Sequence, residues 1–271
     1  MRIILSNVVA IYRRELQSYF VSPLAYAIAC IFWLVAGFFF YVILWDENVG
    51  ILNYSSGVDS ASQQLATFIP FDAGTKLIND FLNSLTWLLF FILPALSMGL
   101  YTEERKRGTL ELLATSPVTN WAVALGKLLG VLTFFITMIL PMLALEAIAL
   151  SSSNPPMALA LPFLGHLALI LLAAAILSLG MFISSLTDST ILSAIFTFLS
   201  TLVILVLPEY LAQRFPNTIG EFIGHFSLLK HYNNLIQGIF DTSSLILFAS
   251  YIFLGIFLTA QSIDAFRFQR Q

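Results

Sequence analysis

The densest group of charged side chains lies in residues 103–127 and opens with two adjacent carboxylates, Glu103 and Glu104. Adjacent carboxylates can bind a metal ion or share the acid and base roles of a hydrolytic reaction. A metal-dependent intramembrane protease needs the pattern E-E-x-x-x-R, and Gly108 stands at the arginine position here. The pair also lies in a charged loop rather than in an apolar span, and no motif places His166 or His225 beside it. These residues therefore disfavour a metalloprotease.

The other residues that could perform chemistry are few and scattered. His225 and His231 have no neighbouring set of carboxylates or thiols, which disfavours a metal site at these two histidines. The sequence contains no G-x-S-x-G, so a serine hydrolase site is disfavoured as well. Cys30 is the only cysteine, which excludes a disulfide-stabilised secreted scaffold.

The composition indicates where such residues would have to work. Of the 271 residues, 59% are hydrophobic and 10% are charged, whereas an average soluble domain has about 25% charged residues. The 25 Phe, 9 Tyr and 4 Trp exclude a disordered chain. A net charge of −3 provides no basic surface for nucleic acid. We therefore predict a polytopic membrane protein that binds no nucleic acid and has the lipid bilayer as its surroundings.

Six runs of the chain are long and apolar enough to cross the hydrocarbon layer, for which a helix needs about 20 residues. They are residues 24–45, 84–102, 128–149, 161–184, 189–208 and 245–263. Because a charge at mid-bilayer costs several kcal/mol, charged residues should avoid these runs, and Glu146 is the only one inside them. No internal repeat or linker divides the chain, so we predict an all-α integral membrane protein with a single domain over residues 1–271.

Glu146 permits two interpretations. A carboxylate inside a span can mark an ion or substrate path, as in a proton-coupled carrier. However, Ser151 and Ser152 follow within about two helical turns, so the side chain lies near the outer interface. We favour an interfacial or interhelix hydrogen-bonding role for Glu146, and a polar packing contact for His166.

Lys and Arg residues are distributed unevenly between the two sides of the six spans. The N-terminal segment, the 103–127 loop and the C-terminal tail hold all of the 12 basic residues except Lys76, Arg214 and Lys230. The positive-inside rule therefore predicts that both termini and the 103–127 loop lie in the cytoplasm, with the chain in the cell (inner) membrane.

The N-terminal residues 3–20 have the pattern of an amphipathic interfacial helix. Apolar residues recur there at helical spacing, at Ile4, Val8, Ile11, Tyr12, Leu16 and Tyr19, whereas Asn7, Arg14 and Gln17 lie on another face. Pro23 then turns the chain into the first span.

Two segments belong to the outer side. Residues 46–83 are rich in Ser, Gly, Gln and acidic residues, and we predict a loop that is too short for a domain. Residues 217–240 retain apolar residues at helical spacing but are too polar to span, so we predict an interfacial or re-entrant helix before the last span.

The cytoplasmic loop continues from its charged beginning into a short apolar helix pattern. Gly108 marks the bend, Leu110, Leu113 and Ala114 share one face, and Pro117 limits the helix. From these residues alone the segment is either a solvated surface helix or a docking element for a soluble partner.

This loop resembles the signature of type-2 ABC exporter permeases, E-E-x-x-x-G-T-x-E-x-L followed by Ser-Pro. The matching residues are Glu103, Glu104, Gly108, Thr109, Glu111, Leu113, Ser116 and Pro117. Upstream, YRRELQSYFVSPLAY, residues 12–26, resembles the N-terminal segment of the gliding-motility (Gld-type) branch of that family. The resemblance extends over essentially the whole chain, although the outer loops add little to it.

The resemblance implies the membrane-spanning half of an ATP-driven exporter that works by alternating access. It implies that the coupling helix, 109–116, docks into an ATPase subunit, and that the N-terminal helix makes a second contact. The residues that it assigns to coupling are Glu103, Glu104, Arg105, Gly108, Thr109, Glu111, Leu113 and Pro117, with Arg13, Arg14 and Glu15 at the second contact. Six spans would pair with a second permease copy or a paralogue.

The chain itself carries no phosphate-binding loop. The pattern G-x-x-x-x-G-K-[ST] does not occur, because Leu128 follows Gly126-Lys127 and Trp121 stands five residues before Gly126. We therefore expect no cofactor on this chain and no enzymatic activity of its own, with ATP and Mg²⁺ on the partner ATPase.

Two alternatives remain open at this stage. One is a six-helix secondary carrier or channel that uses Glu146. The other is a non-transporting membrane component of a motility or secretion assembly. The substrate is not specified by any residue pattern.

Overall fold

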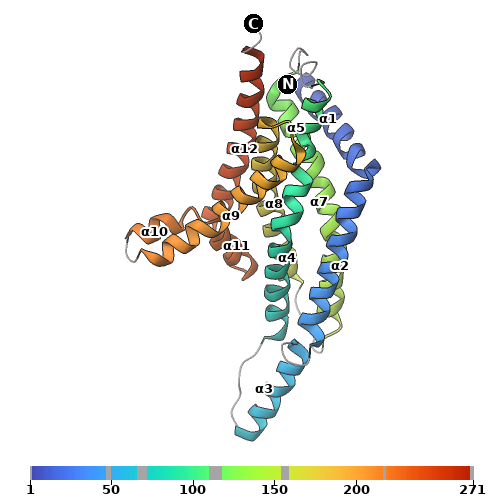
Figure 1. Cartoon of the computed structure of the whole chain (residues 1–271). Helices are drawn as coiled ribbons and strands as arrows, with labels where there is room; N and C mark the ends of the chain where they lie inside the picture. The colour runs from blue at the N-terminus through green and yellow to red at the C-terminus, as the bar shows by residue number, and fades with distance from the viewer. Residues whose placement is uncertain are drawn as a thin grey trace.

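The computed structural model describes residues 2–46, 50–65, 72–109, 118–153, 159–215 and 218–268, and these contain helices and no β-strand. The helices, labelled as in Figure 1, are α1 (Arg2–Val21), α2 (Pro23–Trp45), α3 (Ile51–Leu65), α4 (Ala73–Ser97), α5 (Gly99–Lys106), α7 (Asn120–Ser151), α8 (Ala160–Leu186), α9 (Thr190–Arg214), α10 (Thr218–Gly224), α11 (Leu228–Ile236) and α12 (Thr242–Phe268).

Six helical stretches in the described part are long and apolar enough to cross a membrane. They are Pro23–Trp45, Ala73–Lys106, Asn120–Ser151, Ala160–Leu186, Thr190–Arg214 and Thr242–Ala265. Each coincides with one of the predicted spans, to within one residue at the start of the fifth, so the number and order of the spans are confirmed. Several begin earlier or end later than predicted.

The outer segment 46–83 is helical over most of its length, so the prediction of a loop is wrong. Residues 51–65 form α3, and α4 begins at Ala73, well before the predicted start of the second span. The side chain of Asp72 accepts hydrogen bonds from the backbone amides of Gly74 and Thr75 and caps α4. The first turns of α4 are stable because they bury Leu77 and Phe81 in the core.

The second outer segment, 217–240, forms two short helices, α10 and α11, where one helix was predicted. The chain breaks between them because the Ser227 side chain caps α11 by accepting a 3.1 Å hydrogen bond from the Lys230 amide. Beyond the other end of α11, at Ile236, Gly238 has φ +83°, a conformation that favours glycine. A re-entrant position for these helices stays a prediction.

Helix α8 is the centre of the bundle. It packs against α4, α5, α7, α9, α11 and α12. Of its most apolar 18-residue stretch, 72% is buried inside the bundle. Of the most apolar 18-residue stretches of α2 and α9, only 22% is buried in each, so these two helices present most of their apolar surface outward. Lipid or another membrane-embedded chain can cover such surfaces.

The N-terminal helix α1 packs along α7 near one end of the bundle. Val8 is buried, Ile11, Leu16 and Tyr19 pack against the core, and Arg14 is exposed. A close approach of the two backbones requires Gly126 in α7, because a Cβ atom there would lie 2.8 Å from the Ile11 side chain. The predicted helix over residues 3–20 is thus confirmed, whereas its place in the membrane interface stays a prediction.

Both chain termini, α1 and the end of α5 lie at the same end of the molecule, and α3 extends from the opposite end (Figure 1). The six long stretches account for this arrangement, because an even number of crossings returns the chain to its starting side.

Candidate functional site

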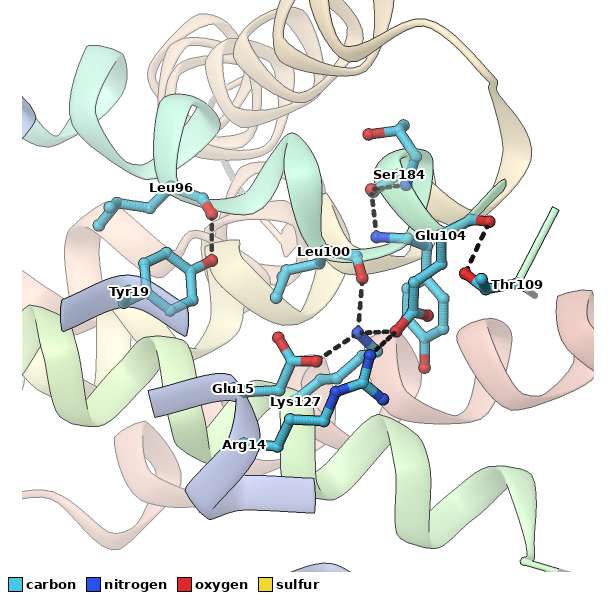
Figure 2. Close-up of polar contacts among 11 residues, drawn as sticks. Arg14, Glu15, Tyr19, Leu96, Leu100, Glu104, Thr109, Lys127 and Ser184 are labelled. Carbon is cyan, nitrogen blue, oxygen red and sulfur yellow. Dashed lines mark hydrogen bonds and ion pairs between the residues drawn. The ribbon is translucent and has the colours of Figure 1, made fainter. Parts of the chain in front are cut away.

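A buried lysine, Lys127 of α7, is the centre of a charged group that also includes residues of α1 and α5 (Figure 2). Its side chain is 2% exposed, and its Nζ atom lies 2.7 Å from Oε1 of Glu15 on α1 and 3.1 Å from Oε1 of Glu104 on α5. Nζ also donates a 2.8 Å hydrogen bond to the Leu100 carbonyl. Three acceptors match the three hydrogens of the ammonium group. We call Arg14, Glu15, Glu104 and Lys127 the Lys127 cluster.

The charges of the Lys127 cluster balance only when all four residues are counted. Arg14 places Nη2 3.8 Å from Oε1 of Glu104, so the two carboxylates have two cationic partners. The Arg14 side chain is 70% exposed, which makes this contact weak, whereas Lys127 is sealed from water. Removing one partner of a buried ion pair typically costs about 3–5 kcal/mol, because the other charge remains buried alone. Lys127 is therefore the residue on which the cluster depends.

Two tyrosines hold the surroundings of the cluster in place. The Tyr101 ring lies beneath the Lys127 ammonium, with 5.0 Å between Nζ and the ring centroid, which adds a cation–π attraction. The Tyr19 hydroxyl donates a 2.7 Å hydrogen bond to the Leu96 carbonyl and joins α1 to α4. Burial, followed by the charges of Glu15 and Glu103, raises the pKa of Tyr19 well above its usual range, so this hydroxyl stays a donor.

A break between α4 and α5, at Met98, aims the start of α5 at the cluster. The Ser184 hydroxyl of α8 accepts hydrogen bonds from the amides of Tyr101 (3.0 Å) and Thr102 (3.2 Å). It donates a third bond, of 3.0 Å, to the Met98 carbonyl. One side chain thus satisfies backbone groups at the break and ties it to the central helix.

The end of α5 explains the spacing between Glu104 and the Gly-Thr pair of the signature. Gly108 has φ +67°, which an L side chain adopts only with strain. The amide of Thr109 donates a 2.9 Å hydrogen bond to the Glu104 carbonyl, and the amide of Gly108 donates a 3.1 Å bond to the Arg105 carbonyl. This is a Schellman C-cap, in which glycine must follow the last helical turn at a fixed distance. The Thr109 hydroxyl adds a 3.2 Å bond to the same Glu104 carbonyl.

The basic residues of α5 point away from the Lys127 cluster. Arg105 forms an ion pair with Asp188 and donates a 3.0 Å hydrogen bond to the Ser185 carbonyl. Lys106 donates a 3.3 Å bond to the Thr190 hydroxyl at the start of α9. The structure therefore links α5 to the connection between α8 and α9 as well as to α1 and α7.

The sequence-predicted site residues are only partly gathered. Glu104, Arg14 and Glu15 lie in the Lys127 cluster, and Glu103 pairs with Arg107 at 3.6 Å on the exposed side of α5. Arg13 is exposed and lies outside the cluster. The remaining coupling residues, Glu111, Leu113 and Pro117, lie outside the described residues.

A cavity of about 310 Å³ opens beside the Lys127 cluster, between α1, α2 and α5. Its lining combines both signs of charge, from Arg14, Glu103, Glu104 and Arg107, with the hydroxyl groups of Ser18 and Tyr19. One carboxylate oxygen here, Oε2 of Glu104, is buried and has no hydrogen-bond partner among the residues that the structure describes.

Comparison with known proteins identifies the family. A family model described as ABC-2 family transporter protein matches residues 9–271. The chain belongs to the ABC-2 transporter family. No curated protein matches it. Family membership makes it a multi-pass permease subunit of an ABC transporter, within a family of non-catalytic membrane components that implies an ABC ATPase as partner.

The central residue of the site in this ABC-2 permease, Lys127, falls within a loop predicted from the sequence. Lys127 was counted with the 103–127 loop because hydropathy treats any lysine as the edge of a span. In the structure α7 begins at Asn120, and Lys127 lies two turns inside it. A usable signal was present in the sequence, because Ala122, Val123 and Ala124 already form an apolar run before Lys127.

Both ring nitrogens of His231, in α11 of the permease, lie within hydrogen-bond distance of other protein groups. His231 Nε2 lies 3.2 Å from the His225 carbonyl, which can only accept, so this nitrogen carries the hydrogen. Nδ1, 2.8 Å away from the Ser244 hydroxyl, then accepts from it. Burial lowers the pKa of His231, which favours this neutral form. Within the described ranges, no three His, Cys, Asp or Glu side chains are grouped to hold a metal ion.

Proposed function

We propose that this ABC-2 permease is an exporter subunit of the gliding-motility branch, located in the inner membrane with both termini in the cytoplasm. Two copies, or this chain and a paralogue, form a twelve-helix pathway that alternates between inward and outward access. The ATPase subunits drive the change from the cytoplasmic side. Support comes from family membership over residues 9–271 and from the match of residues 12–26 to that branch.

The distribution of basic residues supports this orientation. Arg13, Arg14, Lys106, Arg107 and Lys127 lie in α1, in α5 or directly after it, or near the start of α7, at the end that carries both termini (Figure 1). Positively charged residues accumulate on the cytoplasmic side of membrane proteins. The outward-facing apolar surfaces of α2 and α9 support pairing with a second permease.

The single observation that carries the coupling mechanism is the Lys127 cluster. It joins α1, α5 and α7 through one ammonium group at the end where the ATPase would dock. Thr109, the first residue of the 109–116 segment, is held to α5 by the hydrogen bond from its amide to the Glu104 carbonyl. A displacement of that segment by the ATPase therefore reaches Glu104 first, and Lys127 transfers it to α1 and α7.

Docking and transmission can be tested separately. For docking, Glu111→Lys and Leu113→Asp are expected to weaken copurification of the ATPase subunit with the permease. For transmission, the triple variant Lys127→Met, Glu15→Gln, Glu104→Gln removes every strong charge pair of the cluster and leaves only Arg14 unpaired, whose side chain is 70% exposed. We expect the triple variant to retain the ATPase subunit. The permease's effect on ATP turnover should fall about tenfold, which corresponds to a coupling free energy of about 1.4 kcal/mol.

Lys76→Met is the matched control, because Lys76 forms an exposed i,i+4 pair with Asp80 at the opposite end of α4. It should leave both copurification and ATP turnover unchanged. Wild-type turnover in the triple variant would contradict transmission through the cluster. Unchanged copurification of Glu111→Lys and Leu113→Asp would contradict docking through residues 109–116.

A further inference from the structure

A second buried ionisable pair lies far from the Lys127 cluster, near the outer ends of α7 and α8. Glu146 of α7 is 0% exposed and His166 of α8 is 3% exposed. Their nearest atoms, Oε2 of Glu146 and Nδ1 of His166, are 3.5 Å apart. The mechanism proposed above uses neither residue.

The hydrogen bonds of this pair are incomplete. His166 Nδ1 lies 3.0 Å from the Pro162 carbonyl, which can only accept, so Nδ1 carries a hydrogen. Within the described part of the chain, neither carboxylate oxygen of Glu146 has a hydrogen-bond partner, and His166 Nε2 has none either. The interhelix hydrogen bond that the sequence predicted for Glu146 is therefore not formed, although the residue does face a neighbouring helix.

The cost of a buried charge determines how many protons Glu146 and His166 bind. An ionised Glu146 beside a neutral His166 would leave a bare negative charge inside a membrane bundle, which costs several kcal/mol. One additional proton removes that charge in either of two ways, on the carboxylate or on Nε2 of the imidazole. Both arrangements contain the same number of protons, so the two residues bind one proton as a unit.

The surrounding helices bring other titratable groups to this end of the bundle. Among them are Tyr41 and Asp46 of the α2 end, Lys76 and Asp80 of α4, Glu209 of α9, Lys230, His231 and Tyr232 of α11, and Tyr251 of α12. Lys76 and Asp80 neutralise each other at 2.9 Å. Burial, and to a smaller extent the charge of Glu146, raises the pKa of Tyr232. Tyr232 therefore stays a neutral phenol, and its hydroxyl donates a hydrogen bond to the Leu82 carbonyl. Tyr232 thus supplies no counter-charge to the pair.

We propose that Glu146 and His166 form a proton-binding site that is closed in this conformation and opens to the outer side of the membrane. Glu146 precedes the end of α7, at Ser151, by five residues, and His166 follows the start of α8, at Ala160, by six. At about 1.5 Å per residue, both side chains lie less than two helical turns from the outer ends. Separation of α7 from α8 would expose the pair and release its proton to water as Glu146 becomes a solvated carboxylate. Outward opening is then favoured by alkaline pH on the outer side.

The test is the pH dependence of unfolding of the purified permease by SDS, which requires neither substrate nor ATPase. The unfolded chain releases this proton at lower pH than the closed pair, so the wild type should lose stability as pH rises. Relative to Glu146→Gln, which mimics the protonated acid, its unfolding constant should rise as pH rises above about 6, by at most about tenfold per pH unit for one proton. Glu146→Leu serves as a second neutral variant, and Glu209→Gln is the matched control that should follow the wild type.

Infrared difference spectra then locate the proton. A protonated-carboxyl C=O band at neutral pH that is lost in Glu146→Gln and kept in Glu209→Gln places it on Glu146. Absence of this band together with the pH difference places it on His166, and both results support the site. The same pH dependence in wild type, Glu146→Gln and Glu146→Leu would overturn the proposal and would leave the exporter function untouched.

Discussion

At the scale of single residues, the molecule places two kinds of buried charge at opposite ends of the same helix. Lys127, near the start of α7, has three acceptors and two counter-charges nearby. Glu146, near the end of α7, has no hydrogen-bond partner within the described residues. A fully bonded charge fixes one arrangement of its neighbours, whereas an incompletely bonded one favours a change of protonation. Helix α7 is therefore held by ion pairs near its start, whereas a change of protonation is favoured near its end.

Lys127→Met alone should be strongly destabilising. It leaves the Glu15 and Glu104 carboxylates, each 13% exposed, without the ammonium group between them. We expect a loss of about 3–5 kcal/mol in the free energy of unfolding, measured by SDS titration. Adding Glu15→Gln and Glu104→Gln to this variant should restore most of the loss, because no isolated charge then remains buried. Equal stabilities of the single and triple variants would show that charge burial does not control this site.

At the scale of secondary structure, the helices were predictable where hydropathy alone decides and unpredictable where partners decide. The run 161–184 contains no charge and became α8 with nearly the same limits. The start of α7 was missed because the lysine at 127 is buried only by acids from α1 and α5, which a one-dimensional pattern cannot bring together. The start of α4 was missed because its first turns depend on the Asp72 cap and on core contacts.

The candidate site also contains features that the sequence reveals and features that depend on distant partners. Gly108 was correctly predicted to mark a bend, since glycine has a local conformational role that sequence reveals. The inward position of Glu15 was not foreseen, because it was assigned to a contact with a soluble partner. Its burial requires Lys127 from α7, 112 positions further along the chain.

Gly108→Ala tests the helix end that defines the signature. Gly108 has φ +67°, and a Cβ atom there meets nothing within 4 Å, so the expected loss of about 1–2 kcal/mol is purely conformational. Gly37→Ala is the control, because Gly37 is equally uncrowded but lies within α2 at an ordinary helical conformation. It should gain about 0.5–1 kcal/mol. Both can be measured by SDS unfolding, and equal effects of the two alanines would contradict a left-handed requirement at 108.

At the scale of the whole molecule, the two ends of the bundle have different characters. The end with both termini carries α1, α5 and the Lys127 cluster, whereas the opposite end carries α3 (Figure 1). Helix α8 connects the two regions, because it holds the α4–α5 break through Ser184 and contributes His166 near its other end. A displacement of α8 relative to α7 would therefore affect both charged sites.

The orientation of these ends predicts the reactivity of introduced cysteines. In a Cys30→Ser background, Ser56→Cys places a thiol on an exposed position of α3, and Gln17→Cys places one on an exposed position of α1. Because basic residues concentrate at the α1 end, the positive-inside rule puts Gln17 in the cytoplasm and Ser56 outside. A membrane-impermeant maleimide should label Ser56→Cys in intact cells and Gln17→Cys only after permeabilisation. The reverse pattern would place the Lys127 cluster on the outer side, where no ATPase could reach it, and would exclude the proposed coupling mechanism.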